Sequence, residues 1–183
     1  MSRIALRPWE DMAALAVFRD LDPHDFVEAG LVRGANAGGA ALWADWRSIE
    51  GARCASFVAH AGPAALPFAV LGALGTGQAG VACVALLARD HARWRGPLGR
   101  LCVQLRAALP FWCRERGILR LEARSWEAHP TAGRLLAGMG FRPEARLHGF
   151  AGGRAVFVQH ALVLPAPDFP ADFPAEPPIP PQE

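Results

Sequence analysis

The sequence contains no lysine and no tyrosine. All 19 of its basic side chains are therefore arginines, among many alanines, glycines and prolines. This complete replacement of lysine most simply reflects GC-rich coding, so it says little about binding partners. The lack of tyrosine has a chemical consequence, because no phenol group in the chain is available to act as a general acid.

The sequence also lacks an unbroken apolar run. The longest uncharged stretch covers residues 61–88, but Pro63 and Pro67 lie near its start and several glycines interrupt its middle. A membrane-spanning helix needs about 20 consecutive apolar residues, because lipid offers no partners for freed backbone groups. The first residues do not show the basic-then-apolar pattern of a signal segment. We therefore expect no membrane partner and a cytoplasmic location in the producing cell.

Metal-binding patterns are absent at the level of local spacing. The four cysteines lie in apolar surroundings and form no C-x-x-C pair, which predicts buried, reduced thiols. The six histidines are scattered without an H-x-x-x-H or H-E-x-x-H pattern. Local spacing thus predicts no metal site.

Length and hydrophobic periodicity predict one α/β (α+β) domain over residues 1–164. The chain has 183 residues, of which 52% are apolar, enough to build a single core. Asp22 and Pro23 together form a helix start, since one is a good N-cap and the other suits the first helical turn. The predicted elements are a strand over 3–7, helices over 9–19, 23–31 and 40–49, strands over 55–61, 68–74 and 81–88, a helix over 96–116 that Pro110 should kink or split, a strand over 119–123, a helix over 130–139, and strands over 142–149 and 155–164.

Residues 165–183 differ from the rest of the chain. They hold half of the sixteen prolines, four acidic residues and no basic one. Such a segment cannot build a core and should be extended or polyproline-like. Two interpretations stay open: a flexible tail, or an arm that docks Phe169 and Phe173 onto a protein partner.

Positive charge is concentrated in residues 89–154, which carry thirteen arginines against five acids. Residues 1–88 carry six arginines against eight acids. A basic block of this kind favours phosphate groups, either in a nucleotide cofactor or in nucleic acid. An ordinary solvated arginine-rich surface explains the same pattern, and no nucleic-acid-binding motif accompanies it.

Residues 129–144, HPTAGRLLAGMGFRPE, resemble the N-x-x-A-x-x-x-Y-x-x-x-G-F-x-x-E segment of the GNAT superfamily of N-acyltransferases. Ala132, Gly140, Phe141 and Glu144 are in register with it. Residues 117–124 are similar to the superfamily's fifth strand, and the order of elements agrees over residues 80–164. The resemblance implies a GNAT-like fold, with a mixed, mostly antiparallel central sheet flanked by helices, and acetyl-CoA as the acyl donor.

The resemblance also locates the pyrophosphate loop, Q/R-x-x-G-x-G/A, whose backbone N–H groups hold coenzyme A in the superfamily. Arg93 and Gly96 fit this pattern. Pro97 removes one N–H donor, and Leu98 replaces a small residue. The implied cofactor site is therefore a degenerate loop consisting of Arg93, Arg95, Gly96, Leu98 and Gly99.

The catalytic residues implied by the resemblance are altered as well. Leu136 stands where superfamily members often have a tyrosine that protonates the departing thiolate, so a cysteine, a histidine or water would have to do this here. Two candidates for acid–base chemistry are His129, at the position of the family's asparagine, and Glu122, on a strand. The alternatives are a loop or capping role for His129 and an ion pair between Glu122 and a nearby arginine such as Arg120.

A narrower resemblance concerns residues 19–30, RDLDPHDFVEAG, and residues 152–161. Both are similar to GNAT-like proteins of tailed bacteriophages, which in podophages are often labelled internal virion protein A-like. This resemblance implies virion proteins as partners and a place in a virion.

Three function hypotheses follow from the sequence. The first is a phage-type virion structural or assembly component without catalysis, which would explain the altered loop, the missing tyrosine and the Pro-rich segment. The second is an acetyl-CoA-dependent N-acetyltransferase with a divergent loop, and the third is a nucleic-acid-associated arginine-rich module.

Overall fold

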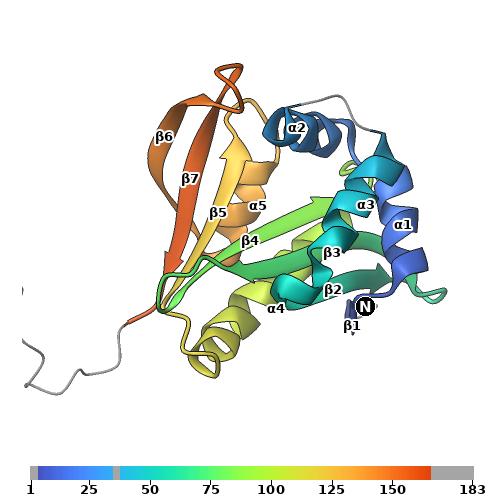
Figure 1. Cartoon of the computed structure of the whole chain (residues 1–183). Coiled ribbons are helices and arrows are strands. Elements are labelled where there is room, and N and C mark those ends of the chain that lie inside the picture. The colour runs from blue at the N-terminus through green and yellow to red at the C-terminus, as the bar shows by residue number, and fades with distance from the viewer. Residues whose placement is uncertain (1–3, 35–37, 166–183) are drawn as a thin grey trace, which may run out of the picture.

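The computed structural model describes residues 4–34 and 38–165 (Figure 1). The predicted docking arm, with Phe169 and Phe173, lies outside these residues. Seven strands form one sheet in the order β1-β2-β3-β4-β5-β7-β6. Their bounds are β1 Ala5–Pro8, β2 Arg53–Ala61, β3 Leu66–Gly75, β4 Val81–Ala88, β5 Arg120–Trp126, β6 Arg142–Phe150 and β7 Ala155–Val163.

The sheet is mixed and mostly antiparallel, as predicted. Only β4 and β5 run parallel to each other, and every other neighbouring pair is antiparallel. A parallel pair needs a crossover connection, and here the long helix α4 (Arg95–Arg114) provides it. The central strands β3 and β4 are almost entirely apolar because helices cover both of their faces.

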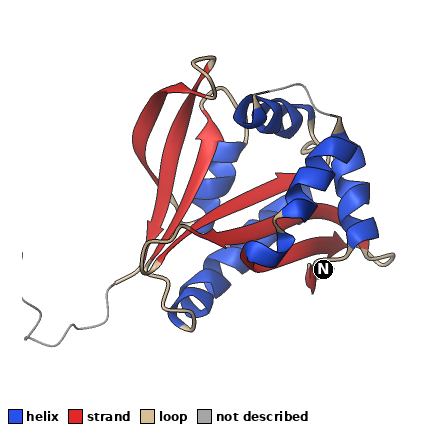
Figure 2. Ribbon diagram, in the orientation of Figure 1, coloured by secondary structure: helices blue, strands red, loops and turns tan. Residues whose placement is uncertain are grey.

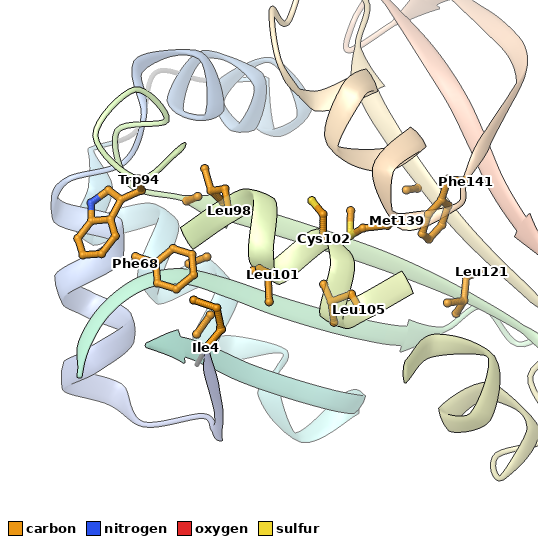
Figure 3. Close-up of a cluster of buried hydrophobic side chains, with 14 of the residues drawn as sticks. Ile4, Phe68, Trp94, Leu98, Leu101, Cys102, Leu105, Leu121, Met139 and Phe141 are labelled. Atoms are coloured by element: carbon orange, nitrogen blue, oxygen red, sulfur yellow. The ribbon is translucent and has the colours of Figure 1, made fainter. Parts of the chain in front are cut away.

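The helices form a layer on each side of the sheet (Figure 2). Helices α1 (Asp11–Arg19) and α3 (Gly39–Ser48) pack on one face, against Val58 and Val70. Helices α4 and α5 (Ala132–Met139) pack on the other face. Figure 3 shows Leu98, Leu101 and Leu105 of α4 along the buried interface with the sheet. Among the described residues, no helix combines the length and the apolar character needed to cross a membrane.

Helix α2 (Pro23–Arg33) lies across one end of the sheet, near the ends of β4 and β5 (Figure 1). It starts as predicted: the side chain of Asp22 accepts the N–H of His24 at 2.9 Å, and Pro23 occupies the first turn. The helix continues two residues beyond the predicted end at Leu31. The reason is that Gly34, with φ 78°, provides the left-handed C-cap.

The predicted split of α4 at Pro110 does not occur, since the helix continues to Arg114; a kink there stays a prediction. A proline removes one backbone hydrogen bond, but Leu105 and Cys113, on either side of it, are buried in the same core. That packing holds both parts in one helix. Gly117, with φ 64°, follows the end of α4, and the N–H of Ile118 bonds back to the carbonyl of Cys113 at 2.9 Å.

Candidate functional site

Strands β4 and β5 separate along their length. They pair only where residues 81–83 face residues 120–122, although β4 continues to Ala88 and β5 to Trp126. Beyond this short contact the two strands diverge toward α2 (Figure 1). The central sheet therefore contains a wedge-shaped gap whose edges are backbone groups without a neighbouring strand.

Two carboxylates of α2 span the open end of this gap. Asp25 accepts the backbone N–H of Ala88, the last residue of β4, at 2.7 Å. Glu28 accepts the backbone N–H of Trp126, the last residue of β5, at 2.9 Å. Residues three apart lie on the same side of a helix, so one face of α2 forms hydrogen bonds with the ends of both strands.

Strand alternation places a further donor along the gap. Because the N–H of Ala88 points away from β3 and into the gap, the N–H of Leu86 points the same way, beyond the residues of β4 that pair with β5. Such an amide is the kind of donor that stabilises the oxygen of a reacting carbonyl group.

A cavity of about 280 Å³ runs along the gap and beneath α4 and α5. Its wall is mostly apolar, and its polar edge is formed by Asp25, Glu28 and His91. Leu136, the residue at the family's tyrosine position, also lines it. The apolar lining includes Val84, Leu86, Leu105, Leu109, Leu121 and Met139. The cavity is near the lower end of the size range of small-molecule sites.

The carboxyl group of Glu28 titrates near neutral pH. Burial raises its pKa from the ordinary 4.5 to about 7, and the hydrogen bond from the Trp126 N–H offsets only part of this effect. Such a carboxyl is partly deprotonated at neutral pH and can both take up and release a proton there.

Asp25 is also the centre of a buried histidine cluster. The Nε2 atom of His129 lies 2.9 Å from Asp25 Oδ1, and the Nε2 atom of His91 lies 3.2 Å from the same oxygen. The Nδ1 atom of His91 contacts the hydroxyl of Thr131 at 2.6 Å. Burial would lower the pKa of His91, but the neighbouring Asp25 and Asp22 carboxylates raise it above its usual value.

His129 has the capping role that the sequence left open. Its Nδ1 atom accepts the backbone N–H groups of Thr131 and Ala132, at 3.2 Å and 3.0 Å, and so caps α5. This cap explains why α5 starts at Ala132 rather than at the predicted Pro130. His129 therefore belongs to the cluster around Asp25, although it does not line the cavity.

Glu122 lies in an ion pair, which was the predicted alternative to a catalytic role. The Nε atom of Arg120 donates to Glu122 at 2.7 Å, and Arg120 also pairs with Glu144. Glu122 is not among the residues that line the cavity.

The predicted pyrophosphate loop lies at the start of α4. Arg93, Arg95, Gly96 and Gly99 are exposed, whereas Leu98 is buried in the core. Asp90 caps the preceding turn: its Oδ1 atom accepts the N–H groups of Ala92 at 2.9 Å and of Arg93 at 3.1 Å. Two amides that could face a phosphate are thus already bonded to a carboxylate of the protein itself. Binding of coenzyme A by these five residues stays a prediction.

Sequence reasoning missed the carboxylates and the histidine on the edge of the cavity. Asp25 and Glu28 did leave a signal, since their spacing after the Asp22–Pro23 helix start puts them on one helical face. Their partners are 63 and 98 residues away in the chain, so their role was not visible. His91 lies in a polar, irregular segment and left no signal.

Ser125 is another polar residue on the cavity wall. Its hydroxyl lies 2.9 Å from the Nε2 atom of His160, and both side chains are buried. Burial lowers the pKa of His160. The pair thus satisfies two polar groups beneath α5.

Comparison by sequence gave no relatives: no protein-family model and no curated protein matches the chain. Solved structures do match. A GNAT-family acetyltransferase from Bacillus anthracis has a TM-score of 0.66 and 12% identity, with 88% of this chain and 95% of that one covered. The ribosomal-protein-S18-alanine N-acetyltransferase from Escherichia coli has a TM-score of 0.62 and 17% identity, with 92% and 97% covered.

A third structure is an acetyltransferase from Bacillus subtilis in complex with CoA, with a TM-score of 0.59, 15% identity and 90% and 99% of the two chains covered. The narrower resemblance to phage proteins finds no support in these three matches. At such low identities the likeness shows the fold alone. The chain has the fold of the GNAT acetyltransferases, as its sequence predicted.

Proposed function

We propose that the protein is an acyltransferase that moves an acyl group from a coenzyme A thioester to an amine. The observation that carries this proposal is the gap between β4 and β5, which opens into an apolar cavity with the carboxyl group of Glu28 on its edge. The cavity fits the acyl and thioester end of the donor. At the phosphate end the side chains of Arg93 and Arg95 would provide the charge, because Pro97 and Asp90 reduce the number of free amides.

The residues of the gap have separate roles in this reaction. A bound acyl-CoA supplies a thioester carbonyl that is open to attack by an amine. The N–H group of Leu86 polarises the carbonyl oxygen, and the apolar wall keeps water away from the thioester carbon. Glu28 takes the proton that the amine nitrogen loses as the C–N bond forms and the C–S bond breaks. Leu136 offers no proton to the departing thiolate, so the thiolate takes one from bulk water as coenzyme A leaves the cavity.

The test measures binding and turnover separately. Acetyl-CoA is titrated calorimetrically into the purified chain, and release of free thiol is then followed with a panel of primary amines. We expect binding by both the wild type and Glu28→Gln, with turnover reduced about 100-fold or more in the variant. Glu122→Gln, a carboxylate outside the cavity, is the matched control and should keep full turnover. The proposal fails if the wild type neither binds acetyl-CoA at millimolar concentration nor releases thiol with any amine.

The other two hypotheses from the sequence remain predictions without support from the site. A virion role would require the protein to be present in purified phage particles. Binding to nucleic acid would use the arginine-rich block, but at least four of its arginines are paired with carboxylates: Arg89, Arg116, Arg120 and Arg146. Neither role explains a buried carboxyl at the edge of an apolar cavity.

A further inference from the structure

We propose that Asp22, Asp25 and His91 bind a divalent transition-metal ion of the Zn²⁺ type, and that His129 holds Asp25 in place for it. The two ligands Asp25 and His91 lie on the polar edge of the cavity, beside Glu28, but binding of the ion does not depend on acyl transfer. The bound ion would connect the start of α2, which carries Asp22 and Asp25, to the loop after β4, which carries His91. The segment after β5 would be attached to the site through the contact between His129 and Asp25.

The geometry brings the donor atoms together from distant parts of the chain. One donor atom from each of Asp22, Asp25, His91 and His129 lies within 4.8 Å of the other three. Donors about 2.1 Å from a tetrahedral ion are about 3.4 Å from one another. The 3.2 Å between Asp25 Oδ1 and His91 Nε2 is close to that separation. Small side-chain movements would bring the other donor atoms, which lie up to 4.8 Å apart, to the same separation.

A second observation, at His91, points to an occupant. Its side chain is only 9% exposed, and its buried Nε2 atom pairs with Asp25 Oδ1 at 3.2 Å without forming a well-aligned hydrogen bond to any of the described residues. That nitrogen faces Asp25, while the opposite nitrogen bonds to the hydroxyl of Thr131 at 2.6 Å. Metal-binding histidines are held in the same manner, with the far nitrogen fixed by a hydrogen bond and the near one free.

His129 supports the site without contributing a ligand. Because its Nδ1 atom accepts two backbone N–H groups, its proton is on Nε2 and is donated to Asp25. Other backbone N–H groups orient the carboxylates as well: Ala88 donates to Asp25, and His91 and His24 donate to Asp22. Ligating carboxylates are commonly oriented by such contacts.

The donor set indicates the class of ion. Two carboxylate oxygens and one imidazole nitrogen suit Zn²⁺, Mn²⁺ or Fe²⁺ better than Mg²⁺ or Ca²⁺, which prefer oxygen alone. A divalent cation would also balance the two negative charges that Asp22 and Asp25 bring into a buried position.

The experiment treats the full chain with EDTA, removes the chelator and titrates Zn²⁺ by calorimetry, with Mg²⁺ in parallel. We expect one equivalent of Zn²⁺ to bind, and Mg²⁺ at least tenfold more weakly. A hundredfold excess of free Zn²⁺ over its Kd should raise Tm by roughly 5–10 °C. Asp25→Asn and His91→Gln should each weaken Zn²⁺ binding at least tenfold. His148→Gln, an exposed histidine on β6, should leave it unchanged.

Two further measurements keep the proposal falsifiable if a buried variant fails to fold. Cys54→Ser removes the exposed thiol that could bind Zn²⁺ elsewhere, and it should bind the ion as the wild type does. Co²⁺ bound to the wild type should show no thiolate charge-transfer band. The proposal is overturned if the wild type binds no Zn²⁺, if folded His91→Gln binds it equally well, or if Cys54→Ser abolishes binding. Acyl transfer measured in EDTA reports on the proposed function alone.

Discussion

Glu28 lies one helical turn after Asp25, and together they bond to the last backbone N–H groups of β5 and β4. The two carboxylates take the place that strand pairing would otherwise fill at the open end of the gap. They do so from a helix, whose position therefore sets how far apart the two strand ends lie. This relationship leads to direct predictions about stability and activity.

Removal of the Asp25 side chain should be costly. In Asp25→Ala the N–H of Ala88 and the ring N–H of His129 lose their acceptor in a buried place, which should lower the free energy of unfolding by about 3 kcal/mol. Urea denaturation in EDTA measures this loss. Asp20→Ala removes a mostly exposed carboxylate that pairs with Arg89 and should cost less than about 1 kcal/mol. Equal losses in both variants would contradict the bridging role.

Glu28→Gln should change how stability depends on pH. The folded chain holds the Glu28 proton until about pH 7, whereas the unfolded chain releases it near its ordinary pKa of 4.5. Unfolding between these values releases a proton, so this residue makes the wild type less stable as pH rises through that window. The variant lacks this effect. The difference in the free energy of unfolding between the variant and the wild type should therefore shift in favour of the variant by up to about 3 kcal/mol from pH 4.5 to pH 8. A difference between the two proteins that is constant with pH would contradict the prediction.

Leu136→Tyr should restore a proton donor for the departing thiolate. Leu136 lines the cavity, so a hydroxyl placed there should raise kcat about tenfold, less than the 10²–10⁴ of optimised acids. Leu136→Phe adds the same ring without the hydroxyl and is the control. If both variants release thiol at the same rate, protonation of the leaving group does not limit turnover.

Asp90→Ala should strengthen the binding of coenzyme A. The substitution frees the N–H groups of Ala92 and Arg93 and removes a negative charge beside the phosphate position. Calorimetry should show acetyl-CoA bound several-fold more tightly than by the wild type. Glu115→Ala, an exposed acid beyond the other end of α4, should have no effect. Weaker binding by Asp90→Ala would place the phosphates elsewhere.

Gly39 and Gly99 should respond in opposite ways to alanine. A Cβ at Gly39 would lie 2.2 Å from the carbonyl oxygen of Phe18, so α3 would have to move away from α1, at a cost of about 2 kcal/mol. A Cβ at Gly99, within α4, meets nothing within 4 Å. Gly99→Ala should therefore stabilise the chain by about 0.5–1 kcal/mol. Thermal unfolding of both variants decides this.

The fold could be predicted because its signals are local. The N-cap at Asp22, the left-handed glycines at Gly117 and Gly140, and the apolar strands each specify an element within a few residues. The helix was not split at Pro110, one of the two outcomes predicted there, because tertiary packing outweighed a local preference. The site could not be predicted in the same way, since the gap exists only where β4 and β5 fail to pair, and each carboxylate bonds to a distant segment.

The short contact between β4 and β5 also means that few backbone hydrogen bonds connect the two parts of the sheet, β1 to β4 and β5 to β7. Three residue pairs join these strands, against seven between β3 and β4. Local opening starts where few backbone hydrogen bonds must break. Amide hydrogen exchange at the contact between β4 and β5 should therefore be faster than in the rest of the sheet. An occupant of the cavity touches both sides and would slow exchange in both at once. If the cavity holds a ligand, as proposed, its binding there would also change the cooperativity of unfolding of the whole domain.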